Sequence, residues 1–114
     1  MDQNRRHKRL NKIITLGFCV PGSKSWEMSV VENISAGGVR FIAPTDIILS
    51  HKVFQLKIRV PELAPNVLEV EAEVVDAKLR KNPKVSDVRA KFINLSDANQ
   101  KYLLDLENLI EKKS

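Results

Sequence analysis

The sequence lacks the features of a secreted, membrane-spanning or disulfide-bonded protein. Its 114 residues include one cysteine, Cys19, which cannot form a disulfide within the chain and lies in an apolar stretch. We interpret Cys19 as a small packed side chain rather than as a redox or nucleophilic site. No apolar run approaches the roughly 18 residues that span a bilayer, and no stretch of the signal-peptide kind follows the N-terminus. We therefore expect a cytoplasmic protein without membrane insertion.

Aromatic residues and histidines are also scarce. Phe, Trp and Tyr together make up 5% of the sequence, which disfavours a nucleic-acid binder that stacks bases on aromatic platforms. The two histidines, His7 and His51, are far apart and have no cysteine or carboxylate at ligand spacing, so a metal site is not expected. No nucleophile–base pair and no phosphate-binding loop is recognisable, so we do not expect an enzyme.

Positive charge is present and unevenly distributed. The net charge of the chain is +5, and its first twelve residues carry five cations and one carboxylate, hence +4. These residues are Arg5, Arg6, Lys8, Arg9, Lys12 and Asp2. We interpret residues 1–12 as a flexible arm without apolar periodicity, and residues 13–114 as one folded domain. A basic arm favours an anionic partner, such as a nucleotide, a nucleic acid or a membrane surface.

The remainder of the chain alternates between apolar and polar residues, which predicts half-buried strands. The predicted strands cover residues 14–20, 26–32, 39–42, 53–60, 68–74 and 88–92. After them the period changes to that of a helix, at about 97–112, with Ser96 as its N-cap. The fold class is therefore mainly β, with about six short antiparallel strands arranged as a barrel or sandwich. The amphipathic helix is expected to cover one open end.

Two segments break the pattern that folding alone requires. In the first, Arg5 and Arg9 stand four residues apart on the arm, and a guanidinium group can hold a phosphate or the O6/N7 edge of guanine with two hydrogen bonds. The alternative is a solubilising tail or a non-specific nucleic-acid patch. On composition alone the alternative is favoured.

The second segment is Asn33-x-Ser35-x-x-Gly38, which we interpret as a turn. The pair Gly37-Gly38 permits positive φ and a close approach of ligand to backbone. The Asn33 amide and the Ser35 hydroxyl can hydrogen-bond a guanine edge. The alternative is a tight hairpin in which Asn33 and Ser35 satisfy their own backbone.

Taken together, Arg-x-x-x-Arg and Asn-x-Ser-x-x-Gly resemble the signature of the PilZ family of bacterial cyclic di-GMP receptors. The resemblance continues through residues 37–41 and 90–97 and covers nearly the whole chain. It implies a six-stranded antiparallel β-barrel with a C-terminal α-helix, in agreement with the strands and helix predicted above.

The resemblance also implies a ligand and a set of binding residues. Arg5 and Arg9 would hold phosphate and guanine, Arg6 would add a phosphate contact, and the arm would fold over the barrel on binding. The implied ligand-binding residues are Arg5, Arg6, Arg9, Asn33, Ser35, Gly37, Gly38 and Arg40. The implied function is that of a receptor or adaptor that regulates an unidentified protein effector, with no cofactor beyond its ligand. The alternatives are a degenerate PilZ interaction module that binds no nucleotide and, less favoured, a small-barrel nucleic-acid binder.

Three positions depart from the family pattern. Many members carry Asp where this chain has Asn33, and many carry Gly where it has Arg89, which would either crowd the site or add a contact. Some members stack a guanine on an aromatic residue at the end of the fifth strand, where this chain has Val75 and Asp76. We interpret Trp26 as a packing residue rather than as a replacement stacking platform.

Overall fold

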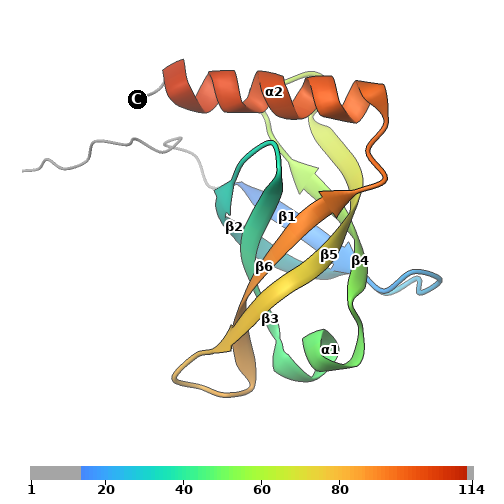
Figure 1. Cartoon of the computed structure of the whole chain (residues 1–114), viewed down its shortest axis with the longest axis vertical. Coiled ribbons are helices and arrows are strands. Elements are labelled where there is room, and N and C mark those ends of the chain that lie inside the picture. The colour runs from blue at the N-terminus through green and yellow to red at the C-terminus, as the bar shows by residue number, and fades with distance from the viewer. Residues whose placement is uncertain (1–13, 113–114) are drawn as a thin grey trace, which may run out of the picture.

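The computed structural model describes residues 14–112, which form a closed antiparallel barrel with a helix at each end (Figure 1). The strands are β1 (Thr15–Cys19), β2 (Glu27–Ile34), β3 (Gly38–Pro44), β4 (Val53–Arg59), β5 (Val67–Leu79) and β6 (Val85–Ile93). They follow one another around the barrel in the order β1-β2-β3-β6-β5-β4. The six-stranded antiparallel barrel with a C-terminal helix is thus confirmed. The expected arm, with Arg5, Arg6 and Arg9, lies outside the described residues.

The barrel interior is filled by one face of each strand. On β4, for example, Phe54, Leu56 and Ile58 are buried while the residues between them are exposed. Phe18 and Phe41 lie at a ring-centroid distance of 5.5 Å, and Phe18 and Phe54 at 6.0 Å. Because these phenylalanines are in the core, none of them is free to stack on a base at the surface.

The C-terminal helix α2 (Asp97–Lys112) covers one end of the barrel, as predicted. Its N-terminus is capped by Ser96, whose hydroxyl oxygen accepts the Asn99 N–H at 3.1 Å. Leu103 and Leu106 are fully buried against the barrel, and the Tyr102 hydroxyl donates to the Pro65 carbonyl at 2.7 Å. Within residues 14–112, neither this helix nor any other is both long and apolar enough to cross a bilayer.

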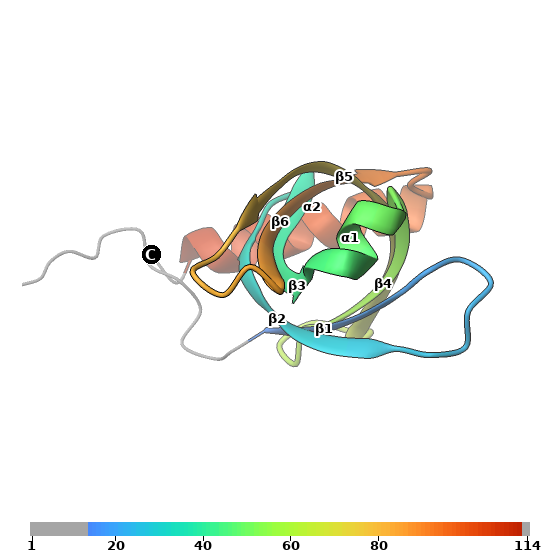
Figure 2. The same cartoon turned by 90° about the horizontal axis from the view of Figure 1, so that it is seen from below.

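A second helix, α1 (Thr45–Ser50), was not predicted. It follows β3 directly and lies across the opposite end of the barrel from α2 (Figure 2). Ile48 is its one buried residue, and the Thr45 hydroxyl is 2.7 Å from the hydroxyl of Ser86 on β6. The two helices together close both ends of the barrel.

The fifth strand is longer than predicted. It runs to Leu79, with a register shift against β6 between Val74 and Asp76. Val75 and Asp76 therefore lie at a bulge inside β5, not at its end, and Val75 is half exposed.

Cys19 is packed, as the sequence interpretation expected, and Trp26 is partly buried. Cys19 is buried, and burial raises the pKa of its thiol. The Trp26 ring covers Gly17, and the Lys57 ammonium lies 4.5 Å from the Trp26 ring centroid. Trp26 does not line either of the two pockets described below.

Candidate functional site

The Asn33-x-Ser35-x-x-Gly38 segment spans the end of β2, the turn at residues 35–37 and the first residue of β3, so it forms the tip of the β2–β3 hairpin. The Ser35 N–H donates to the Gly38 carbonyl at 2.9 Å, and the Gly37 N–H donates to the Ser35 hydroxyl oxygen at 3.3 Å. A bulge between Val31 and Asn33 precedes the turn, so that Asn33 pairs with Arg40 on β3. The hairpin projects from the sheet toward α2 (Figure 1).

The glycine pair does not adopt the positive φ predicted for it. The only glycine at positive φ among the described residues is Gly22, so neither Gly37 nor Gly38 uses the conformational freedom expected of it. Gly38 is required because β6 lies against it. A Cβ at this position would collide with the Ala90 carbonyl oxygen and lie 3.2 Å from the Cα of Lys91. The β6 backbone thus approaches Gly38 closely, while the close approach of a ligand stays a prediction.

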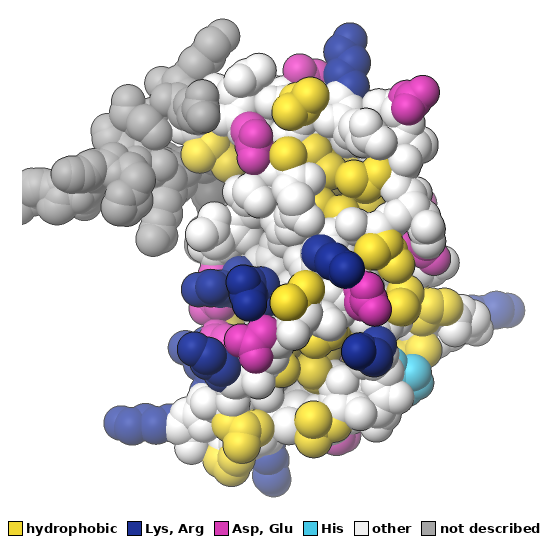
Figure 3. All heavy atoms as spheres, in the orientation of Figure 1, with side chains coloured by type: hydrophobic (Ala, Val, Ile, Leu, Met, Phe, Trp, Pro, Cys, Tyr) yellow, Lys and Arg dark blue, Asp and Glu magenta, His cyan; other side chains and the backbone are white. Residues whose placement is uncertain are grey.

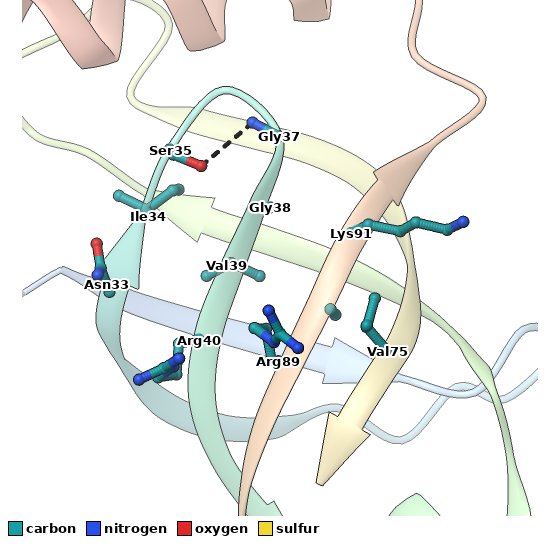
Figure 4. A pocket seen from close by; sticks show the side chains of 11 residues that line it. Asn33, Ile34, Ser35, Gly37, Gly38, Val39, Arg40, Val75, Arg89 and Lys91 are labelled. Carbon is teal, nitrogen blue, oxygen red and sulfur yellow. Dashed lines mark hydrogen bonds between the residues drawn. The ribbon is translucent and has the colours of Figure 1, made fainter.

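An open pocket of about 290 Å³ lies beside the hairpin (Figure 4). Five of the residues implicated by the sequence line it: Asn33, Ser35, Gly37, Gly38 and Arg40. The other lining residues are Ile34, Val39, Val75, Arg89, Ala90 and Lys91. The structure therefore gathers the described part of the sequence motif around one hollow. The arginines of the arm lie outside the described residues.

The polar groups of the hairpin are only partly engaged with the protein. Ser35 accepts a hydrogen bond from the turn, which agrees with the tight-hairpin alternative, but its hydroxyl hydrogen remains free to donate. The Asn33 side chain makes no hydrogen bond to another described residue, so its carbonyl and amide groups are both open to a ligand. The hairpin thus presents one acceptor and two kinds of donor.

The pocket lining is cationic. Arg40 and Arg89 are directly opposite each other in the β3–β6 ladder, and neither forms an ion pair with another described residue. Lys91, opposite Gly38, lies 3.5 Å from the Glu73 carboxylate. No carboxylate is among the residues that line the pocket. Because like charges directly opposite each other repel, this arrangement favours an anion in the pocket.

A neighbouring pocket of about 590 Å³ has a lining of mixed charge. It shares Asn33, Arg40 and Arg89 with the first but also contains carboxylates. Its lining is Glu32, Asn33, Arg40, Asp76, Lys78, Asp87, Val88 and Arg89. Basic and acidic side chains lie side by side on this part of the surface (Figure 3). Its charges are balanced, so it attracts an anion less than the hairpin pocket does.

The carboxylates of this second pocket form a small cluster. Arg80 bridges Glu32 at 3.6 Å and Asp87 at 3.3 Å. Burial raises the pKa of Glu32, as does the adjacent Asp87 carboxylate, while Arg80 and Arg40 oppose the increase in pKa. The Glu32 and Asp87 carboxylates thus offset the positive charge of the arginines that line the second pocket.

Six pocket residues were absent from the implied ligand-binding set, and four of them, Val75, Arg89, Ala90 and Lys91, come from β5 and β6. Arg89 was noted only as a departure from the family pattern. These residues enter the site because β6 is the neighbour of β3 and because β5 bulges at Val75. Strand order and register are properties of the tertiary structure, and no local sequence motif predicts them.

Residues 14–112 contain no group of three or more metal-ligating side chains. The glutamates of β5 have ordinary surface partners: Glu73 pairs with Lys91, and Glu71 accepts a hydrogen bond from the Asn94 amide at 2.9 Å.

Comparison with known proteins identifies the fold and the family. The family model described as the PilZ domain matches residues 3–109. The chain therefore belongs to the PilZ family, the class of protein that its barrel and hairpin motif indicate. A search of curated proteins found no match.

Solved structures agree with the fold. The chain is similar to the inhibitor of motility MotI (DgrA) of Bacillus subtilis, with a TM-score of 0.68 and 20% identity over 99% of this chain and 55% of that one. It is also similar to the PilZ domain of YcgR from Escherichia coli, solved with cyclic di-GMP, with a TM-score of 0.67 and 16% identity. That match covers 96% of this chain and 93% of the YcgR domain. The chain thus spans about half of MotI but nearly all of the YcgR domain.

A third similar structure is PlzA of Borreliella burgdorferi in complex with cyclic di-GMP. Its TM-score is 0.56 and its identity is 10%, over 83% of this chain and 43% of PlzA. At these identities the likeness shows a shared fold.

Proposed function

We propose that the protein is a non-enzymatic receptor for cyclic di-GMP, which binds in the hairpin pocket and regulates a downstream protein partner. The observation that carries this proposal is the pocket itself. The chain is a PilZ domain, and its pocket combines the free Asn33 amide and the Ser35 hydroxyl with a cationic lining that contains no carboxylate. Cyclic di-GMP offers the complementary groups, because it has guanine edges and two phosphates.

The hairpin would take a guanine. The Asn33 carbonyl is able to accept from the guanine N1–H and N2–H₂ donors, and the Ser35 hydroxyl is able to donate to a ligand acceptor. Asn33 carries no charge, so its hydrogen bonds to guanine are weaker than those of an aspartate. Arg40 and Arg89 would hold phosphate, which would also relieve their mutual repulsion.

The arm would supply the remaining contacts. Arg5 and Arg9 would grip phosphate and guanine from outside the barrel, with Arg6 on a phosphate. Ordering each arm residue costs on the order of 1–2 kcal/mol of conformational entropy. The charge-assisted hydrogen bonds must exceed that cost, which restricts the ordered state to the liganded protein. The resulting change of surface is the signal that a partner would read.

Calorimetric titration with cyclic di-GMP, with GTP as the competitor control, tests the proposal. Selective binding at micromolar concentration or tighter is expected. Arg5→Ala, Arg9→Ala and Asn33→Ala should each weaken binding by about tenfold or more, the loss of one or two good hydrogen bonds. Arg59→Ala is the matched control, since Arg59 is exposed on β4 and lines neither pocket. Equal affinity of wild type and the arm variants would show that the arm is not part of the site.

A PilZ interaction module without nucleotide binding is the second candidate. The placement of Arg89 favours it, because this long side chain occupies the pocket lining opposite Arg40. If wild type is folded and binds no cyclic di-GMP, Arg89→Gly distinguishes the two readings. A gain of binding in Arg89→Gly would show that Arg89 obstructs an otherwise competent site.

A further inference from the structure

The turn of the ligand motif is hydrogen-bonded to the C-terminal helix. The Ala36 N–H, between Ser35 and Gly37, donates to a carboxylate oxygen of Glu107 on α2 at 2.7 Å. The two residues are 71 positions apart in sequence, and the contact is partly buried. It is a charge-assisted hydrogen bond, a class stronger than a bond between neutral groups.

Three further hydrogen bonds of the turn stay within the barrel. Ser35 donates to Gly38, and Gly37 donates to the Ser35 side chain. The Gly37 carbonyl accepts the Phe92 N–H of β6 at 3.0 Å. The bond from Ala36 is thus the one hydrogen bond among these that reaches an element outside the barrel. It comes from the middle of the segment that presents Ser35 to the pocket.

Glu107 is carried on a well-anchored part of the helix. Its neighbour Leu106 is 1% exposed, and Leu103, one turn earlier, is fully buried against the barrel. Leu109 and Ile110 pack against the same core, as does Ala36 from the hairpin side. The hairpin tip lies directly beneath the helix (Figure 1). The Glu107 carboxylate is therefore an acceptor at a fixed place. On the side that faces α2, the hydrogen bonds of the sheet alone do not hold the Ser35–Gly37 turn.

We propose that Glu107 is a positioning residue for the hairpin site and that it couples ligand binding to the docking of α2. This inference rests on the proposed function, since it deepens the role of the same site. Glu107 does not line the pocket and would not touch the ligand. It holds the Ser35–Gly37 turn in the geometry that the ligand meets. If the Glu107 hydrogen bond strengthens ligand binding, then by linkage the ligand strengthens this hydrogen bond, and with it the docking of α2, by the same free energy.

The first test compares Glu107→Ala with Glu107→Gln. The alanine variant loses the acceptor and should bind cyclic di-GMP about tenfold more weakly. The glutamine variant keeps a carbonyl acceptor in the same place and should restore most of that affinity. Asn99→Ala is the matched control, because Asn99 donates to the Glu69 carbonyl at 3.0 Å and so fixes the same helix away from the hairpin. It should lower the thermal stability without changing the dissociation constant.

The second test is amide hydrogen exchange measured by NMR on the full chain. Without ligand, Ala36 and Gly37 should exchange faster in Glu107→Ala than in wild type or Asn99→Ala. With cyclic di-GMP, exchange in the second half of α2 should slow in wild type and not in Glu107→Ala. Unchanged hairpin exchange together with unchanged affinity in Glu107→Ala would overturn the inference. If wild type binds no cyclic di-GMP, the proposed function fails, while exchange in the ligand-free proteins still decides whether Glu107 holds the turn.

Discussion

Gly37 and Gly38 are adjacent in sequence but occupy different environments. A Cβ at Gly37 would meet only the Ser35 hydroxyl oxygen, at 4.0 Å, whereas Gly38 lies against the backbone of β6. Gly38→Ala must push Ala90 and the strand away, so it should destabilise the protein by about 1–3 kcal/mol, the usual cost of overpacking. Gly37→Ala should change the free energy of unfolding by less than about 0.5 kcal/mol. Urea denaturation of the two variants measures both values, and similar losses would contradict the packing explanation.

Glu32 gives the stability of the protein a dependence on pH. Its pKa is raised above the ordinary value of 4.5, chiefly by burial and then by Asp87. In the window that begins near pH 4.5 and extends upward, the folded state therefore binds more protons than the unfolded chain, and stability falls as the pH rises. Glu32→Gln removes this titration, so its melting temperature should decline less across the window. Thermal melts between pH 4.5 and 7 check this, with Glu27→Gln, an exposed glutamate of the same strand, as the control.

At the residue scale, sequence spacing identified the hairpin side of the pocket and missed the β6 side. Asn33, Ser35 and Gly38 stand close together in sequence, so a local motif brings them to the same turn. Arg89 and Lys91 reach the pocket only through their pairing with β3. The packing of Gly38 against β6 was missed for the same reason, because the strand that excludes a side chain there lies some fifty residues downstream.

At the scale of elements, alternation was enough to place six strands and one helix, but not α1. With six residues and a proline N-cap that makes no side-chain capping bond, α1 is too short to show a helical period. The extension of β5 was missed because the bulge at Val75 interrupts the alternation that marks a strand. Short helices and bulges are set by tertiary packing, which overrides weak local signals.

The helix α1 should act as a plug for its end of the barrel. Ile48 is buried, whereas its neighbour Leu49 is 78% exposed. Ile48→Ala should therefore cost about 2–4 kcal/mol of unfolding free energy, because it leaves a cavity in the core. Leu49→Ala should be neutral to within about 0.5 kcal/mol. Chemical denaturation decides between this view and one in which α1 is only a connection, for which both substitutions would be mild.

At the scale of the whole molecule, the distribution of charge predicts how binding responds to salt. The hairpin pocket gathers Arg40, Arg89 and Lys91 without a lining carboxylate, whereas the adjacent pocket is neutralised by its own acids. The attraction of the hairpin pocket for a dianion is therefore largely electrostatic, and dissolved salt should screen it. Between 0.05 and 0.5 M NaCl, over which the Debye length falls severalfold, affinity for cyclic di-GMP should drop by about three- to tenfold.

Titrating the Arg89→Gln variant with cyclic di-GMP over the same salt range shows whether Arg89 attracts the ligand or obstructs the pocket. If Arg89 holds phosphate, the variant should bind more weakly at low salt, and its affinity should change less with salt, because one charge of the site is gone. Arg59→Gln removes an equal charge from β4, outside both pockets, and should preserve the slope of wild type. Tighter binding by Arg89→Gln at every salt concentration would instead mean that the arginine blocks the site. The bulk of the Arg89 side chain, rather than its charge, would then determine how well the ligand fits the pocket.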